Sequence, residues 1–159
     1  MKLVIVESPA KCKKIESFLG NDYKCLASFG HIRELTNGLK CIDIKNNFEP
    51  TFTIMESKTR NIKTLKKFIK KADEVIIATD DDREGEAIGW HICKTFNLPT
   101  QTTKRIIFRE ITKSAVKKAI ANPGILNMQK IYAQLARQIL DRLVGFIVSP
   151  QLWKSISRN

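Results

Sequence analysis

Glu74-Val-Ile-Ile-Ala-Thr-Asp-Asp-Asp-Arg-Glu-Gly-Glu-Ala-Ile-Gly-Trp90 has the pattern of a strand, an acidic turn and a helix. The apolar run 75–78 is short, continuous and mostly β-branched, which is typical of a strand buried on both faces of a parallel sheet. It is followed at once by three aspartates, Asp80, Asp81 and Asp82. Ligands of open α/β sheets bind beyond the carboxyl ends of the strands, so these carboxylates are expected at a ligand site.

Carboxylates held this close together repel one another, and a bound cation offsets the repulsion. An open cluster of oxygen ligands beside a phosphate substrate favours Mg²⁺. Because successive side chains alternate in direction, we expect Asp80, Asp82 and Glu84 to face inward and Asp81 to lie in solvent. The alternative is a solvated helix N-terminus with acidic caps, where negative charge is also favourable.

A second strand, 2–7, ends in the same way, since Glu7 precedes a helix predicted over 9–19. If the two strands are neighbours, Glu7 and Asp80 lie side by side at one edge of the sheet. Lys11 is in the first turn of its helix, where the helix dipole disfavours a cation unless an anion is bound nearby. A solvated lysine is the alternative.

Strands and helices alternate along the rest of the chain. Further strands are expected over 23–28, 51–55 and 104–109, a polar loop over 37–47, and helices over 58–71, 83–95, 113–121 and 126–145. Ser57 and Thr112 are the expected N-caps of two helices. The alternation predicts a Rossmann-like α/β fold with a mainly parallel sheet flanked by helices. We place the domain boundary between 1–122 and a second, helical segment, 123–159, which is incomplete.

Composition indicates the class of partner. The chain has 159 residues, with 28 Lys and Arg against 16 Asp and Glu and a formal net charge of +12, which favours a polyanion such as nucleic acid. The four cysteines lack Cys-x-x-Cys spacing and are expected to be reduced thiols. With no apolar run of membrane-spanning length and no signal peptide, we expect a cytoplasmic or nucleoid-associated protein that is not secreted.

Several motifs carry a family resemblance. Val4-Ile-Val-Glu-Ser-Pro-Ala-Lys11, Gly30-His-Ile-Arg33 and Ala78-Thr-Asp-Asp-Asp-Arg-Glu-Gly-Glu-Ala87 together resemble the TOPRIM domain of type IA DNA topoisomerases, the bacterial topoisomerase I group. Phe108-Arg-Glu-Ile-Thr112 is similar to the next signature of the family. Ala136-Arg-Gln-Ile-Leu-Asp-Arg-Leu-Val-Gly-Phe-Ile-Val-Ser-Pro150, with Trp153, resembles the start of its helical DNA-binding domain. The motifs span nearly the whole chain in the family's order.

The resemblance implies roles for the matching positions. Glu7 would be the catalytic acid, with Lys11 and Arg83 on the scissile phosphate, and Glu7, Asp80, Asp82 and Glu84 would hold Mg²⁺. DNA contacts are implied for Lys11, His31, Arg33, Arg83, Arg137, Gln138, Asp141, Arg142, Phe146 and Trp153. From the residues alone, Arg137 and Asp141 are four apart and can simply pair on a helix, while Phe146 and Trp153 can be core residues.

The reaction implied by the resemblance is reversible transesterification on single-stranded DNA. A tyrosine forms a 5′-phosphotyrosyl bond, another strand passes through the gap, and negative supercoils relax. The enzyme is expected to act as a monomer. Tyr23 and Tyr132 are the chain's two tyrosines, and neither is in a motif like the family's nucleophile region. We therefore expect the chain to carry the metal and acid half of the site and to be inactive alone. The alternatives are a stand-alone TOPRIM nuclease or primase-like module and a noncatalytic DNA-binding module; the helical run after Pro123 favours the topoisomerase.

Overall fold

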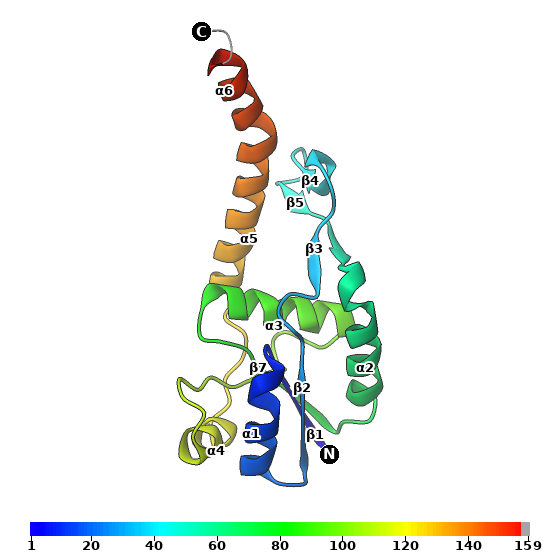
Figure 1. Ribbon diagram of the computed structural model, residues 1–159, viewed down its shortest axis with the longest axis vertical. Coiled ribbons are helices and arrows are strands. Elements are labelled where there is room, and N and C mark those ends of the chain that lie inside the picture. Colours follow the sequence, from blue (N-terminus) through cyan, green and yellow to red (C-terminus); the bar gives the residue numbers. More distant parts are fainter. Residues whose placement is uncertain (157–159) are drawn as a thin grey trace.

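The structure, a computed structural model, describes residues 1–156 and has a sheet-containing body from which a long helix projects (Figure 1). The sheet has four strands in the order β2-β1-β7-β8, and all neighbouring pairs are parallel. These strands are β1 (Lys2–Val6), β2 (Tyr23–Ala27), β7 (Glu74–Ala78) and β8 (Lys104–Arg105). The expected Rossmann-like α/β fold with a mainly parallel sheet is confirmed.

Helices cover both faces of the sheet. They are α1 (Pro9–Leu19), α2 (Thr59–Ile69), α3 (Arg83–Phe96) and α4 (Lys113–Ala121). Alternate residues of β1 point into two cores: Leu3 and Ile5 pack with residues of α2 and α3, whereas Val4 and Val6 pack with residues of α1 and α4. This double burial explains why the strand sequences are continuously apolar.

A long helical rod follows the α/β body. It consists of α5 (Met128–Leu143), a π-helical turn at Val144–Val148 and α6 (Ser149–Ile156). The first two turns of α5 are anchored on α3, because Ile131 and Leu135 join the core that contains Ile88 and Ile92. The later part leaves the body (Figure 1), where Phe146 is 51% and Trp153 70% exposed.

Beside this rod are the short elements between β2 and α2 (Figure 1). They form two small antiparallel pairs, β3 with β6 and β4 with β5, and two 3-10 turns. Their bounds are β3 (Arg33–Leu35), β4 (Ile42–Asp43), β5 (Glu49–Pro50) and β6 (Phe52–Ile54), with the turns at Leu39–Cys41 and Glu56–Lys58.

Several local expectations were wrong. The segment 104–109 contributes only the two residues of β8 to the sheet, where Arg105 pairs with Ile77 of β7 and also forms an antiparallel bridge with Gly124. Ser57 lies in a 3-10 turn, and the N-cap of α2 is Lys58. The segment 37–47, expected as a loop, contains the short strand β4. The expected capping role of Thr112 is confirmed.

Within residues 1–156, no helix is both long and apolar enough to cross a membrane.

Candidate active site at the carboxyl edge of the sheet

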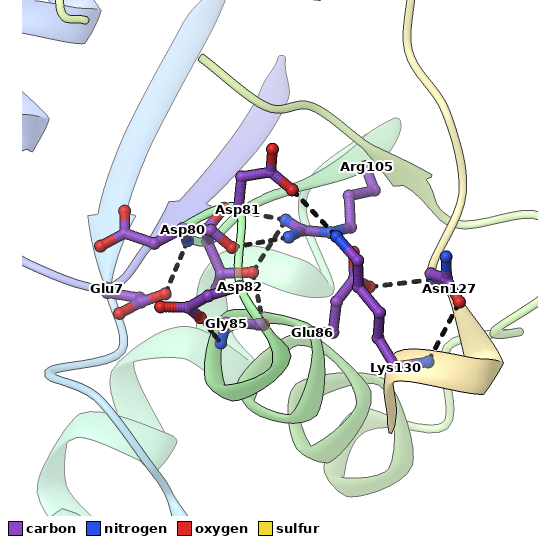
Figure 2. Close-up of polar contacts among 10 residues, drawn as sticks. Glu7, Asp80, Asp81, Asp82, Gly85, Glu86, Arg105, Asn127 and Lys130 are labelled. Atoms are coloured by element: carbon purple, nitrogen blue, oxygen red, sulfur yellow. Dashed lines mark hydrogen bonds and ion pairs between the residues drawn. The ribbon is translucent and has the colours of Figure 1, made fainter. Parts of the chain in front are cut away.

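Glu7 and Asp80 meet at the carboxyl edge of the sheet. β1 and β7 are adjacent and in register, Val6 opposite Ala78, so the chain leaves both strands at the same level. The backbone N–H of Asp80 donates to Glu7 Oε1 at 2.7 Å (Figure 2). The ammonium of Lys11 forms an ion pair with Asp80 Oδ1. The strand pairing thus brings Asp80 to an acid and a cation, Glu7 and Lys11, that lie 73 and 69 positions earlier in the sequence.

Burial sets the protonation of Glu7. Desolvation raises the pKa of this carboxyl above its ordinary value and outweighs the hydrogen bond from Asp80, which lowers it. The charges of Asp80 and Asp82 raise the pKa further, and the Lys11 ammonium lowers it. The loss of water around the group is therefore a larger cause of the raised pKa than the neighbouring carboxylates.

The acidic turn is tied to the first turn of α3. Asp82 is the N-cap and accepts the N–H of Gly85 at 2.6 Å (Figure 2), while the Thr79 hydroxyl donates to the Gly85 carbonyl at 2.6 Å. A Cβ at Gly85 would lie 2.2 Å from the carbonyl oxygen of Asp80. Glycine is therefore required for the backbones of the turn and the helix to approach this closely.

The other acidic residues have partners of their own. Asp81 is exposed, as expected, and its Oδ1 also lies 3.1 Å from the Lys130 ammonium, which reaches it from α5 (Figure 2). Sequence reasoning missed this pair because it joins residues 49 positions apart. Glu84 Oε1 lies 3.2 Å from His31 Nε2, so Glu84 extends toward His31.

A buried ion pair supports the turn from below. The Arg105 guanidinium donates to Glu86 Oε1 at 2.9 Å, to the Thr79 carbonyl at 2.9 Å and to the Asp80 carbonyl at 2.8 Å. Glu86 Oε2 accepts the N–H of Asn127, the N-cap of α5, at 3.0 Å (Figure 2). Since Arg105 and Glu86 are each 2% exposed, the acidic turn and the start of α5 are joined through a desolvated pair.

Sequence reasoning did not identify this pair. Arg105 begins a run of apolar residues in a segment predicted as a strand, and Glu86 stands among the apolar residues of α3. A charged residue in a buried element needs a charged partner, and that rule was the available signal.

Most of the residues expected to contact DNA line one groove between β3 and α5. It encloses about 500 Å³, and six of the expected residues are in its lining. These are His31, Arg33, Gln138, Asp141, Arg142 and Phe146. The Arg33 guanidinium lies 5.4 Å from the Phe52 ring centre, and Arg142 Nη1 donates to the Thr36 and Gly38 carbonyls at 3.3 and 3.4 Å.

The remaining expected DNA contacts lie outside that groove. Arg83 is exposed at the start of α3, and Lys11 is paired with Asp80. Arg137 lies 3.9 Å from Asp141 on an exposed face of α5, as the i,i+4 alternative predicted. Trp153 is exposed on α6, so neither it nor Phe146 is a core residue within the described chain.

A buried histidine lies behind His31. His91 is fully buried, and both of its ring nitrogens lack a hydrogen-bond partner among residues 1–156. Its ring packs edge to face on Phe52, Trp90 and His31, with centroid distances of 4.6, 4.9 and 6.2 Å. Burial, with the charges of Arg33 and His31, lowers the pKa of His91 to about 3, so the ring is neutral.

The family model described as the Toprim domain matches residues 2–111, more than half of the chain. The chain belongs to the Toprim family. Its match includes the strand ends that carry Glu7 and Asp80, and it stops just before α4.

The Toprim chain is also similar to a solved topoisomerase. The structure of full-length topoisomerase I from Thermotoga maritima superposes with a TM-score of 0.86 at 46% sequence identity, over 95% of this chain. The chain spans about a quarter of that protein, 26% of its length. The match extends past the Toprim segment into α5, in agreement with the resemblance of its motifs.

Toprim domains typically bind divalent cations. The carboxylate oxygens of Glu7, Asp80 and Asp82 are the ligand type that Mg²⁺ prefers. Among residues 1–156, however, no three His, Cys, Asp or Glu side chains gather closely enough to hold a metal ion. Lys11 already contacts Asp80, and the Gly85 N–H contacts Asp82. The ligand chemistry of the edge therefore fits a divalent cation, while the positions of the side chains within residues 1–156 do not form a three-ligand site.

Proposed function

We propose that this chain is the acid- and cation-binding half of a type IA DNA topoisomerase. The observation that carries the proposal is the junction of Glu7, Asp80 and Lys11 at the ends of two adjacent parallel strands. It is supported by the likeness to Thermotoga maritima topoisomerase I, which continues beyond the Toprim segment. A small Toprim nuclease or primase-like module has no evident use for the helical rod that follows.

In this proposal, Glu7 protonates the 3′ oxygen that leaves when a DNA strand is cleaved. A carboxyl group donates a proton near neutral pH when its pKa is raised, and burial shifts Glu7 in that direction. Lys11 and Arg83 bind the scissile phosphate, Lys11 exchanging its Asp80 partner for a phosphate oxygen. Bound Mg²⁺ would supply positive charge and orient the 3′-hydroxyl for rejoining, held by Glu7, Asp80 and Asp82 with support from Glu84.

The attacking group comes from outside residues 1–159. A nucleophile must approach the phosphorus to within about 3–3.5 Å in an aligned geometry. Tyr23 begins β2 at the amino end of the sheet, roughly 16 Å from the carboxyl edge at the usual rise of a five-residue strand. Tyr132 is 62% exposed on α5, at the groove formed with the β4–β5 loop. We therefore propose that the isolated chain neither cleaves nor relaxes DNA.

The groove between β3 and α5 would receive the single-stranded substrate. Its guanidinium groups attract phosphates, and the exposed ring of Phe146 offers a stacking surface for a base. His31 contacts Glu84 at one end of this groove, so the groove and the acidic edge are continuous.

A chimera tests this function. Residues 1–156 would replace the matching quarter of Thermotoga maritima topoisomerase I, which supplies the remaining three quarters. We expect Mg²⁺-dependent relaxation of a negatively supercoiled plasmid, a covalent protein–DNA adduct, and loss of both in Glu7→Ala. The matched control is Glu49→Ala, which removes a carboxylate from β5, away from the acidic edge.

Two results would contradict the proposal. If the chimera with Glu7→Ala still relaxed the plasmid, Glu7 would not be the catalytic acid. Metal-dependent nicking by the 159-residue chain alone, without an adduct and lost in Glu7→Ala, would favour a Toprim nuclease.

A further inference from the structure

A second groove runs along the free edge of the sheet. It encloses about 770 Å³ and is bounded by α1, the edge strand β2 and the start of α2, and we call it the α1–α2 groove. β2 lies between these two helices (Figure 1). Within the sheet it is an edge strand, and it pairs with β1. None of the residues that line this groove lines the groove between β3 and α5.

The α1–α2 groove opens next to the acidic edge. Pro9, two residues after Glu7, is part of its wall. Phe29 lines it as well, and the neighbouring Gly30 donates its N–H to the Glu7 carbonyl at 3.3 Å. Cys12 and Lys13, which follow Lys11 directly in α1, are also in its lining, so the groove lies close to Lys11.

Its walls carry an excess of positive charge. The lining contains one carboxylate, Glu16, which forms an ion pair with Lys24 at 2.9 Å. It contains four cations: Lys13, Lys24, Lys58 and Arg60. Lys13 on α1 and Arg60 on α2 are exposed on opposite walls, and neither has a carboxylate partner within residues 1–156. This arrangement attracts a polyanion along the groove, because each phosphate neutralised releases a bound counterion.

Phe29 stands at the mouth of the groove in an unusual conformation. Its ring is 52% exposed, and its φ of +59° is a left-handed value that is strained for a bulky residue. Lys58 holds it there, donating to the Phe29 carbonyl and placing its ammonium 6.0 Å from the ring centre. An exposed ring between cations is the pattern with which proteins bind single-stranded nucleic acid, bases stacking on the ring and phosphates meeting the cations.

We propose that the α1–α2 groove binds the single-stranded DNA that continues from the scissile phosphate, with Phe29 stacking on a base and Lys13 and Arg60 contacting phosphates. The proposal rests on the proposed topoisomerase function and extends its DNA path to a second groove of the Toprim domain. Charge alone also suits an acidic peptide. The exposed aromatic ring and the junction with the acidic edge favour DNA.

Cys12 is a native reporter of occupancy. It is half-buried in the α1–α2 groove, whereas Cys25, Cys41 and Cys93 are buried. Burial raises the pKa of the Cys12 thiol, so the probe reaction, alkylation by iodoacetamide, is run at mildly alkaline pH and followed by mass spectrometry. The chain would be mixed at low salt with an oligothymidylate, and its binding measured in parallel by fluorescence anisotropy.

We expect bound oligothymidylate to slow Cys12 alkylation several-fold, and high salt to restore the rate. If oligothymidylate binds without protecting Cys12, the proposal that the α1–α2 groove binds DNA is overturned, and the proposed function is left intact. Absence of binding at low salt would count against both. Protection by a polyglutamate peptide but not by the oligonucleotide would assign the groove to an acidic partner.

Charge variants provide a second measurement. Lys13→Ala/Arg60→Ala should flatten the slope of log affinity against log salt by about 1.4, the value for two single-strand phosphate contacts. The control, Lys70→Ala/Lys71→Ala, removes equal charge at the far end of α2 and should leave the slope nearly unchanged. Equal effects of the two variants would overturn the proposal.

The aromatic contact has its own test. Phe29→Leu should weaken oligothymidylate binding by roughly 5- to 150-fold, the range for losing one stacked base, and Phe29→Trp should retain it. Both substitutions keep a large apolar group in the same backbone conformation, so a merely structural role would not separate them. Equal affinities of the two variants would exclude stacking.

Discussion

Replacing Arg105 by methionine should destabilise the chain strongly. Methionine keeps much of the volume of the side chain but removes the guanidinium, and Glu86 then remains as a buried carboxylate without its partner. The carbonyls of Thr79 and Asp80 lose their donors at the same time. The perturbation therefore acts at the base of the acidic turn, outside the residues proposed to contact DNA.

The expected cost follows from burial. Because Arg105 and Glu86 are each 2% exposed, solvent cannot compensate for the lost partner. Breaking a buried ion pair by removing one member costs roughly 3–5 kcal/mol, a large share of the 5–15 kcal/mol that holds a typical domain folded. Replacing both members, in Glu86→Gln/Arg105→Met, should cost less than the sum of the single changes, since no buried charge is left alone.

Urea unfolding followed by circular dichroism measures these free energies. Arg105→Lys serves if the methionine variant does not fold, because lysine keeps the charge but cannot donate in the planar fork that reaches Glu86 and both carbonyls. Its amide NMR shifts should differ from wild type at residues 80–82. A cost below about 1 kcal/mol for Arg105→Met would refute the view that this pair supports the turn.

Three further predictions concern Gly85, Glu7 and His91. Gly85→Ala should cost about 1–3 kcal/mol, since its Cβ would lie 2.2 Å from the Asp80 carbonyl oxygen, whereas Gly145→Ala, with nothing within 4 Å, should be neutral or stabilising; equal costs in urea unfolding would contradict this. Glu7→Gln should stabilise the fold at neutral pH and not under acidic conditions, because a raised pKa gives stability that is present at low pH and lost as the pH rises. His91 has the opposite sign: its pKa of about 3 means that wild type should lose about 2 kcal/mol between pH 7 and pH 5, and His91→Leu should lose much less; parallel pH profiles would contradict a neutral buried ring.

Sequence patterns predicted the elements that bury apolar residues on regular faces. The runs that form β1 and β7 are continuously apolar because both faces of the sheet are covered. The helices α1 and α3 end close to their predicted limits, at C-caps Gly20 and Asn97 that have positive φ values. The helix predicted over 126–145 was nearly right in extent. Its continuation through a π-helical turn into α6 was not predicted, because the turn lies in an apolar run without a local signal.

The neighbourhood of Glu7 and Asp80 was also predictable, since it depends on two strand ends and their adjacency. The partners of the other charges were not. Asp81 with Lys130 and Arg105 with Glu86 depend on where α5 and β8 pack, and sequence spacing carries no information about such contacts. The assigned roles of the metal-binding and DNA-binding residues stay predictions.

The most direct test of the account is a titration of Mg²⁺ into the isotopically labelled chain, followed by NMR, with and without an oligothymidylate. We predict weak binding that shifts the signals of Glu7, Asp80 and Asp82, and that tightens when the oligonucleotide supplies phosphate oxygens. Asp80→Ala/Asp82→Ala should abolish these shifts, while Asp43→Ala/Glu49→Ala, which removes two carboxylates from the β4–β5 pair, should not. Identical Mg²⁺-induced shifts in wild type and in Asp80→Ala/Asp82→Ala would contradict the claim that the carboxyl edge of the sheet is the cation-binding site.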